Sequence, residues 1–127
     1  MILFTSDLLF GSKILGAAKY AGVRGQGVRG RASLAQHADN ATHYFLDLEA
    51  ELALGESTDD LLDAALGHPR LRVFVFAGHL QTEALKRATA KIAASGASGH
   101  EVHSRGSLNA RLSIILPPNT PAATESR

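Results

Sequence analysis

The sequence contains no cysteine among its 127 residues. This absence excludes disulfide bonds, thiolate zinc sites and cysteine nucleophiles, and it is typical of proteins in a reducing compartment. No apolar run approaches the roughly 18 residues of a membrane-spanning helix. The short apolar N-terminus is interrupted by Asp7, so it does not predict a signal peptide. We therefore expect a soluble, cytoplasmic protein.

The sequence also lacks a strong excess of charge of either sign. Its formal net charge is +1, so no overall field attracts nucleic acid or an anionic membrane, and neither is expected as a partner. With 45% hydrophobic residues, a chain of this length predicts one globular domain, assigned to residues 1–116. The polar remainder, residues 117–127, is expected to be a mobile tail.

Two kinds of segment alternate along the chain. Runs rich in β-branched and aromatic residues predict strands, and apolar residues at helical spacing predict helices. The predicted strands are residues 1–5, 23–30, 43–48, 70–78 and 100–103. The predicted helices that follow them are residues 7–22, 31–41, 56–69, 81–97 and 107–116. This alternation predicts an α/β fold: a flavodoxin-like, doubly wound parallel sheet in the order 2-1-3-4-5, with helices on both faces.

Two of these segments allow more detailed expectations. Residues 73–76 form an unbroken apolar run, which predicts a strand buried on both faces. We expect Phe74 and Phe76 to point to opposite faces of the sheet. In the first predicted helix, the apolar residues expected to face the core include Leu8 and Leu15.

Two aspartates follow predicted strands. Asp7 follows the first strand and Asp47 ends the third. In the predicted strand order, ligands bind where the C-terminal ends of these two strands meet, so both carboxylates are expected there and could hold a cation. Simpler interpretations stay open, because Asp7 could be only a helix N-cap and Asp47 could pair with Arg105. Glu49 and Glu51 are expected to be solvated loop acids.

Four stretches occur in a particular order along the chain: Asp7 after the first strand, FLDLEAELALG around Asp47, VFVFAGH as the fourth strand and GASGHEVHSRGSL before the last helix. In this order they resemble a response-regulator receiver domain, over residues 1 to about 116. The resemblance implies a phosphoacceptor at Asp47 and a magnesium ion held by acids that include Asp7. It also implies a Ser or Thr on the fourth strand that senses phosphorylation, and a lysine after the fifth strand.

Several positions depart from this receiver pattern. Ser6 stands where a magnesium-binding acid is usual, Ala77 where the hydroxyl is usual, and His103 or Arg105 where the lysine is usual. These residues are expected to line the mouth of the site. A missing carboxylate weakens magnesium binding, and a missing ammonium removes charge that would neutralise a phosphoryl group. We therefore interpret the chain as a degenerate, or pseudo-, receiver.

The glycine-rich segment from Arg24 to Arg31 places arginines beside backbone amides. It matches neither the dinucleotide fingerprint nor the P-loop, and it predicts a basic edge strand and turn. An anion-binding or nucleic-acid patch stays open. The six histidines lack metal-ligand spacing, so zinc is not expected.

Three functions are compatible with these features. The preferred one is a non-enzymatic signalling or protein-interaction module of two-component signalling, which acts by being bound because no output domain follows. The first alternative is an atypical receiver that accepts phosphate at Asp47, and the second is a small-ligand binder at the C-terminal edge of the sheet. No cofactor is expected beyond weak Mg²⁺ binding, on the order of millimolar. Surplus apolar residues in 14–23 and 112–116 predict a homodimer.

Overall fold

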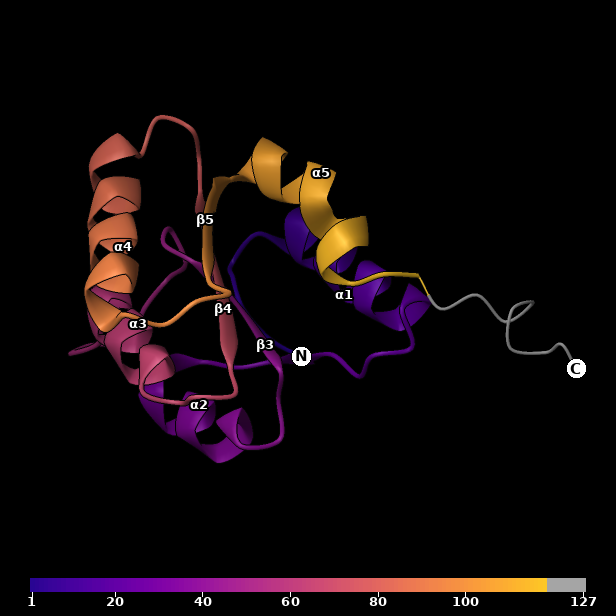
Figure 1. Cartoon of the computed structure of the whole chain (residues 1–127), viewed down its shortest axis with the longest axis horizontal. Coiled ribbons are helices and arrows are strands. Elements are labelled where there is room, and N and C mark those ends of the chain that lie inside the picture. The colour runs from indigo at the N-terminus through magenta and orange to yellow at the C-terminus, as the bar shows by residue number, and fades with distance from the viewer. Residues whose placement is uncertain (119–127) are drawn as a thin grey trace, which may run out of the picture.

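The structure is a computed structural model that describes residues 1–118. Strands and helices alternate along these residues, as predicted (Figure 1). The strands are β1 (Ile2–Phe4), β2 (Gln26–Gly27), β3 (His43–Asp47), β4 (Arg72–Ala77) and β5 (Glu101–Ser104). The helices are α1 (Leu8–Tyr20), α2 (Gly30–Ala38), α3 (Thr58–Leu66), α4 (Thr82–Ser95) and α5 (Arg105–Ile115). Most of the predicted tail, residues 119–127, lies outside the described residues.

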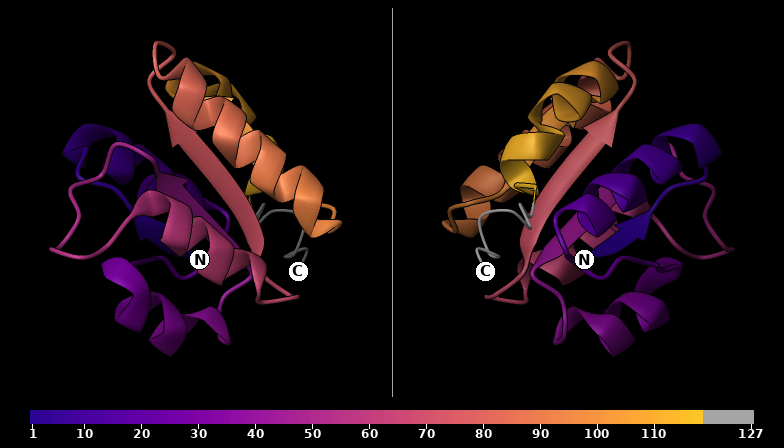
Figure 2. Two further views of the ribbon diagram at one scale, coloured as in Figure 1. Left: turned by 90° about the vertical axis from the view of Figure 1, so that its left-hand side faces the viewer. Right: turned by 90° about the vertical axis from the view of Figure 1, so that its right-hand side faces the viewer.

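The strands form one parallel sheet in the order β2-β1-β3-β4-β5, which confirms the predicted flavodoxin-like order. Helices α1 and α5 cover one face, and α2, α3 and α4 cover the other (Figure 1). The two side views show α4 and α5 towards the β4–β5 end, whereas α1 and α2 lie towards the other end (Figure 2). This arrangement follows from right-handed crossovers between parallel strands.

The central strand β4 contributes to two hydrophobic clusters, one on each face of the sheet. Val73 and Val75 pack on the α2, α3 and α4 side, and Phe74 and Phe76 pack on the α1 and α5 side. The expectation that β4 is buried on both faces is therefore confirmed. The expectation that the two phenylalanines point to opposite faces is wrong, because side chains two residues apart in a strand point the same way.

Helix α1 begins at its N-cap Asp7, whose carboxylate accepts a hydrogen bond of 3.0 Å from the Phe10 N–H. The buried face of α1 consists of Phe10, Ile14 and Ala18, spaced four residues apart, with Gly11. Leu8 is 85% exposed, so the expectation that it faces the core is wrong. The reason is helical phase: Leu8 lies two residues before Phe10, on another side of the helix.

Strand β2 lies at the edge of the sheet and pairs with β1 alone, through two residues. Both of these residues are exposed. The predicted edge strand is therefore confirmed, but its two residues carry no charge, and the arginines Arg24 and Arg29 flank it. None of the helices in residues 1–118 is long and apolar enough to cross a membrane.

Candidate functional site

Asp47 lies at the C-terminal end of β3 and is only 1% exposed, the one charged residue in the described core. The Thr5 hydroxyl donates to its Oδ2 over 2.6 Å, and Arg105 Nη2 donates to the same oxygen over 3.1 Å. The backbone N–H of Glu49 donates to Oδ1 over 2.9 Å. Both oxygens are therefore partnered, which offsets the cost of removing a carboxylate from water.

Arg105 follows β5 directly as the first residue of α5, so its side chain lies at the C-terminal edge of the sheet. Its guanidinium contacts three carboxylates: Nε lies 3.2 Å from Asp7 Oδ2, Nη2 contacts Asp47, and Nη1 donates to Glu49 Oε1. The group also lies over the Phe76 ring, 5.7 Å from its centroid. Burial opposes the charge, but the hydrogen bond to Glu49 and the nearby carboxylates raise the pKa of Arg105.

Glu49 joins the site from the loop after β3. Its Oε1 accepts hydrogen bonds from Arg105 and, over 2.7 Å, from the Gly78 N–H after β4. These bonds, the one from Arg105 first, hold the pKa of the Glu49 carboxyl below its usual value. Glu49 is an exposed loop acid, as expected, but its carboxylate is not free, because it connects the ends of three elements.

Thr5 is a site residue that the sequence reasoning missed. Its hydroxyl donates to Asp47 and accepts the Asp7 N–H over 3.1 Å. The available signal was its position directly after β1, at the edge that holds Asp47. Ser6, which was expected to line the mouth, accepts the N–H of Glu51 over 2.8 Å in the loop after β3.

Ala77 and His103 were the other expected mouth residues. Ala77 is fully buried at the end of β4, paired in register with Ser104, and has no hydroxyl to offer. His103 lies towards α5, with Nδ1 2.8 Å from the Ser107 hydroxyl and Nε2 2.6 Å from Glu101 Oε1. Of the two candidates for the lysine position, the structure therefore places Arg105 against Asp47.

The carboxylates do not fit a resident magnesium ion in this arrangement. The oxygens of Asp7, Asp47 and Glu49 all face one cation, and that cation is the guanidinium of Arg105. Within residues 1–118, no group of three or more His, Asp or Glu side chains is placed to hold a metal ion. A hard octahedral cation needs several free oxygen ligands, and the arginine occupies the side of the carboxylates where they would converge.

Comparison with known proteins adds information about the fold. No protein-family model and no curated protein sequence matches the chain. Among solved structures, it is similar to a signal receiver domain from Vibrio parahaemolyticus, with a TM-score of 0.61 and 14% identity, covering 91% of this chain and 87% of that one. It is also similar to a response regulator receiver domain from Rhodospirillum rubrum, with a TM-score of 0.60 and 15% identity over 94% of this chain and 96% of that one.

A third similar structure is a CheY-like response regulator receiver domain from Methanospirillum hungatei JF-1. Its TM-score is 0.61 at 11% identity, over 91% of this chain and 90% of that one. Coverage is nearly complete in each case, so the likeness extends over the whole sheet and its helices. The chain therefore has the fold of a response-regulator receiver domain.

Proposed function

We propose that this chain is a signalling module that acts by binding a protein partner, and that Asp47 does not operate a phosphorylation switch in it. The observation that carries the proposal is the position of Arg105. Its guanidinium contacts Asp7, Asp47 and Glu49 at once, so the unmodified site already has an internal cation. The receiver fold supports a signalling role by analogy.

The geometry around Asp47 supports the absence of a switch. An attacking carboxylate oxygen needs a lone pair directed at the phosphorus atom. Oδ2 already accepts two hydrogen bonds, one of them from Arg105, and Oδ1 accepts one from the Glu49 N–H. A switch also needs an element that interacts differently with the two states of the aspartate. Ala77 cannot form the hydrogen bond that would report such a change.

The partner surface implied by the receiver fold is the face formed by α4, β5 and α5. A groove of about 440 Å³ lies there between α4 and β5, lined partly by Leu85, Ala93 and Val102. Tyr20 on α1 and Ile114 on α5 are exposed on the two helices that cover one face of the sheet, and they support a homodimer as part of the proposal. We also propose a cytoplasmic location, in two-component signalling.

The alternative function is an atypical receiver that accepts phosphate at Asp47. The observation in its favour is an excess of negative charge, since three carboxylates face one guanidinium. If Arg105 moved aside, the three carboxylates could attract a divalent cation. The third candidate function is a small-ligand site at the same edge of the sheet. Its ligand would occupy the space that a phosphoryl group on Asp47 needs.

The test exposes the wild-type protein and the Asp47→Asn variant to acetyl phosphate and Mg²⁺, followed by intact mass, oligomeric state and amide spectra. We expect no phosphoryl adduct on the wild type and the same fold and assembly in both proteins. An adduct absent from Asp47→Asn, together with a change in assembly, would establish the alternative. Asp63→Asn, which removes an exposed carboxylate bound to Lys91, is the matched control.

Magnesium binding gives a second readout of the same proposal. Titration with Mg²⁺, followed by the amide signals of Asp7 and Asp47, should show no saturation below about a millimolar. The Arg105→Met variant keeps a long side chain but removes the charge, so it should bind Mg²⁺ more tightly than the wild type. Equal or weaker binding by Arg105→Met would show that the guanidinium does not compete with a cation.

A further inference from the structure

Strand β5 and the first turn of α5 hold a hydrogen-bonded chain of three side chains, Glu101, His103 and Ser107. Glu101 and His103 lie two residues apart in β5, so both point to the same side of the sheet, towards α5. Nε2 of His103 lies 2.6 Å from Glu101 Oε1, and Nδ1 lies 2.8 Å from the Ser107 hydroxyl. A nucleophile, a base and a carboxylate that orients the base are arranged in this order in serine-dependent acyl transfer.

The carboxylate of Glu101 determines which ring nitrogen of His103 carries the proton. Arg111 donates to both of its oxygens, over 3.1 Å from Nε and 2.8 Å from Nη2, and this pairing holds the pKa of the Glu101 carboxyl below its usual value. An ionised carboxylate can only accept hydrogen bonds, so Nε2 donates to it. In the neutral ring Nδ1 is therefore the acceptor, and the Ser107 hydroxyl donates to it.

The three side chains differ in their access to solvent. Ser107 is exposed, whereas the side chains of His103 and Glu101 are only 13% and 20% exposed. A reagent can therefore reach the hydroxyl from solution, while packing and two hydrogen bonds keep the imidazole in place behind it. This combination of an accessible nucleophile and a fixed base is what nucleophilic catalysis needs.

The start of α5 supplies hydrogen-bond donors beside the serine. The Ser107 N–H is taken by the N-cap Ser104, whose hydroxyl lies 3.2 Å away. The N–H groups of Arg105 and Gly106 precede it and have no intrahelical acceptor. Within residues 1–118 neither forms a backbone hydrogen bond. A Cβ added at Gly106 would meet no atom within 4 Å, so the approach to this turn is open.

An apolar groove borders the same histidine. The groove of about 440 Å³ between α4 and β5 has His103 in its lining, together with Leu85, Ala93 and Val102. Because β5 is an edge strand, no further strand separates this groove from Ser107. A short apolar acyl chain lying in the groove would bring its carbonyl group to the sheet edge beside the serine.

We infer that Ser107 is an acylation site that accepts an acyl group from an activated ester, with His103 as the general base. Ser107 Oγ attacks the carbonyl carbon, and its proton passes to His103 Nδ1. The N–H groups of Arg105 and Gly106 would donate to the oxyanion that forms. When the carbonyl re-forms, the bond to the leaving oxygen breaks and that oxygen takes the proton from His103, which leaves an acyl-serine and a free alcohol. Glu101 does not touch the ester and acts as a positioning residue.

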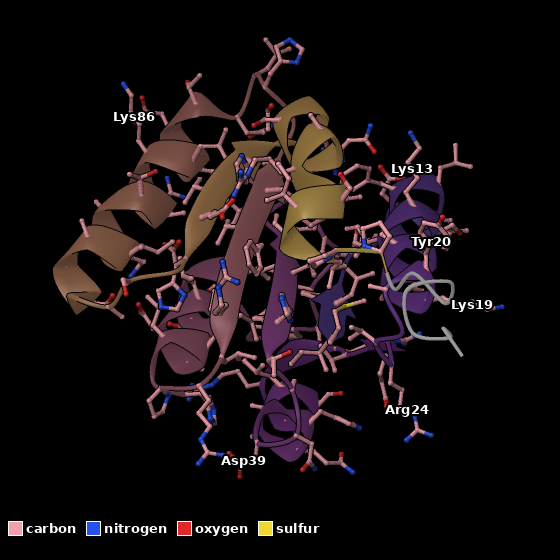
Figure 3. All side chains as sticks on the ribbon, turned by 45° about the vertical axis from the view of Figure 1, so that its right-hand side comes forward. Lys13, Lys19, Tyr20, Arg24, Asp39 and Lys86 are labelled. Atoms are coloured by element: carbon pink, nitrogen blue, oxygen red, sulfur yellow. The ribbon has the colours of Figure 1, made fainter. Side chains whose placement is uncertain are left out.

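The test incubates the full chain with p-nitrophenyl acetate near neutral pH and maps the acetylated residues by mass spectrometry. We expect Ser107 to gain one acetyl group faster than any lysine, because lysine amines are protonated at this pH. Exposed lysines that also react include Lys13 and Lys19 on α1 and Lys86 on α4 (Figure 3), so the position of the adduct decides. Acetyl groups on lysines with none on Ser107 would overturn the inference.

Variants test the role of the base. His103→Gln should slow acetylation of Ser107 at least about tenfold, because general base catalysis contributes that much or more. Ser107→Ala removes only an exposed hydroxyl and should abolish the adduct in this segment. Ser113→Ala, which removes another exposed serine of α5, is the matched control and should leave the rate unchanged. Unaltered acetylation of Ser107 in His103→Gln would show that the imidazole does not activate it.

The role of Glu101 is tested by the tautomer of His103. NMR of the ring nitrogens in the wild-type protein should show a protonated Nε2 and an unprotonated Nδ1 once the ring is neutral. Glu101→Gln should introduce the other tautomer and slow acetylation of Ser107. A proton on Nδ1 in the wild type would contradict the inference, and this measurement does not depend on the folding of any variant. The activity goes beyond the proposed function: phosphorylation of Asp47 would overturn that function and leave these results standing.

Discussion

At the scale of single residues, the site is a buried carboxylate with partners from three parts of the chain. Asp47 receives hydrogen bonds from Thr5, from the Glu49 backbone and from Arg105. Removing one partner from a buried charge costs more than the bond itself contributes, because the remaining charge stays desolvated. Substituting each partner and measuring the free energy of unfolding therefore shows how much that partner stabilises the buried charge.

Arg105→Ala should lower the free energy of unfolding by roughly 2–4 kcal/mol, because it leaves Asp47 buried without its cation. In the Asp47→Asn background the same substitution should cost less, by roughly 1 kcal/mol or more, since no buried charge remains to be neutralised. Urea unfolding of the four proteins gives this double-mutant cycle. Additive losses would show that Arg105 stabilises the fold without acting on Asp47. Arg87→Ala, which removes an exposed pair with Asp59, should cost about 0–1 kcal/mol.

Thr5→Val keeps the shape of the side chain and removes its hydroxyl. Asp47 loses a donor and the Asp7 N–H loses an acceptor, so we expect a loss of roughly 1–2 kcal/mol in the free energy of unfolding. The control is Thr89→Val, whose hydroxyl only returns to Leu85 O on the exposed side of α4. Thermal unfolding compares the two variants, and an equal effect would contradict the assigned role of Thr5.

At the scale of elements, the start of α5 decides which residue reaches Asp47. The sequence predicted a strand over residues 100–103 and a helix from residue 107, which left Arg105 in a loop. In the structure Ser104 is the N-cap and accepts the Ser107 N–H, so α5 begins at Arg105 directly after β5. The backbone of the first turn of a packed helix is held more firmly than that of a loop. The Arg105 guanidinium is therefore expected to keep its position against Asp47.

The turn from β2 into α2 depends on glycine at position 30. Gly30 has a φ of +62°, and an added Cβ would lie 2.9 Å from Glu56 Oε1. Gly30→Ala should therefore lower the free energy of unfolding by about 1–2 kcal/mol. Gly16→Ala, in α1 where a Cβ would meet no atom within 4 Å, should instead raise it by roughly 0.5–1 kcal/mol. Urea unfolding measures both, and a neutral Gly30→Ala would show that the turn tolerates another conformation.

At the scale of the whole molecule, stability should depend on a partly buried histidine at the N-terminal edge of the sheet. The ring of His43 stacks on Phe74, 5.6 Å between centroids, and on Phe45. Burial first, and then the positive charges of Arg72 and the N-terminal amine, lower the pKa of His43 below its usual 6.5. The folded protein therefore disfavours the protonated ring.

The sign of the pH effect follows from this shift. Below pH 6.5 the unfolded chain binds a proton at His43 that the folded chain resists, so the free energy of unfolding should fall as the pH drops from about 7.5 to about 5. His43→Gln should flatten this slope in part, because burial also lowers the pKa of His100. His79→Gln, an exposed histidine, should leave it unchanged. Urea midpoints across this range provide the measurement, and an unaltered slope in His43→Gln would refute the assignment.

The sequence by itself determined the fold and part of the site. Alternating strand and helix patterns, with crossovers of one hand, leave few topologies for a chain of this length, so the sheet order was predictable. The same patterns placed Asp7 and Asp47 at the ends of adjacent parallel strands. Capping chemistry at Asp7 was also readable, because an N-cap acts within three residues of chain.

Only the tertiary structure decided which residues partner Asp47. Thr5, Arg105 and Glu49 meet through contacts between residues 42, 58 and 56 positions apart, and no local pattern encodes which donor reaches a carboxylate. The outcome depends on strand register, on where α5 begins and on the reach of a long arginine side chain. A groove of about 890 Å³ beside the site has the same origin, since its lining comes from residues 3–15, 27–32 and 51–56, which are separated in sequence and brought together by the parallel order of the strands.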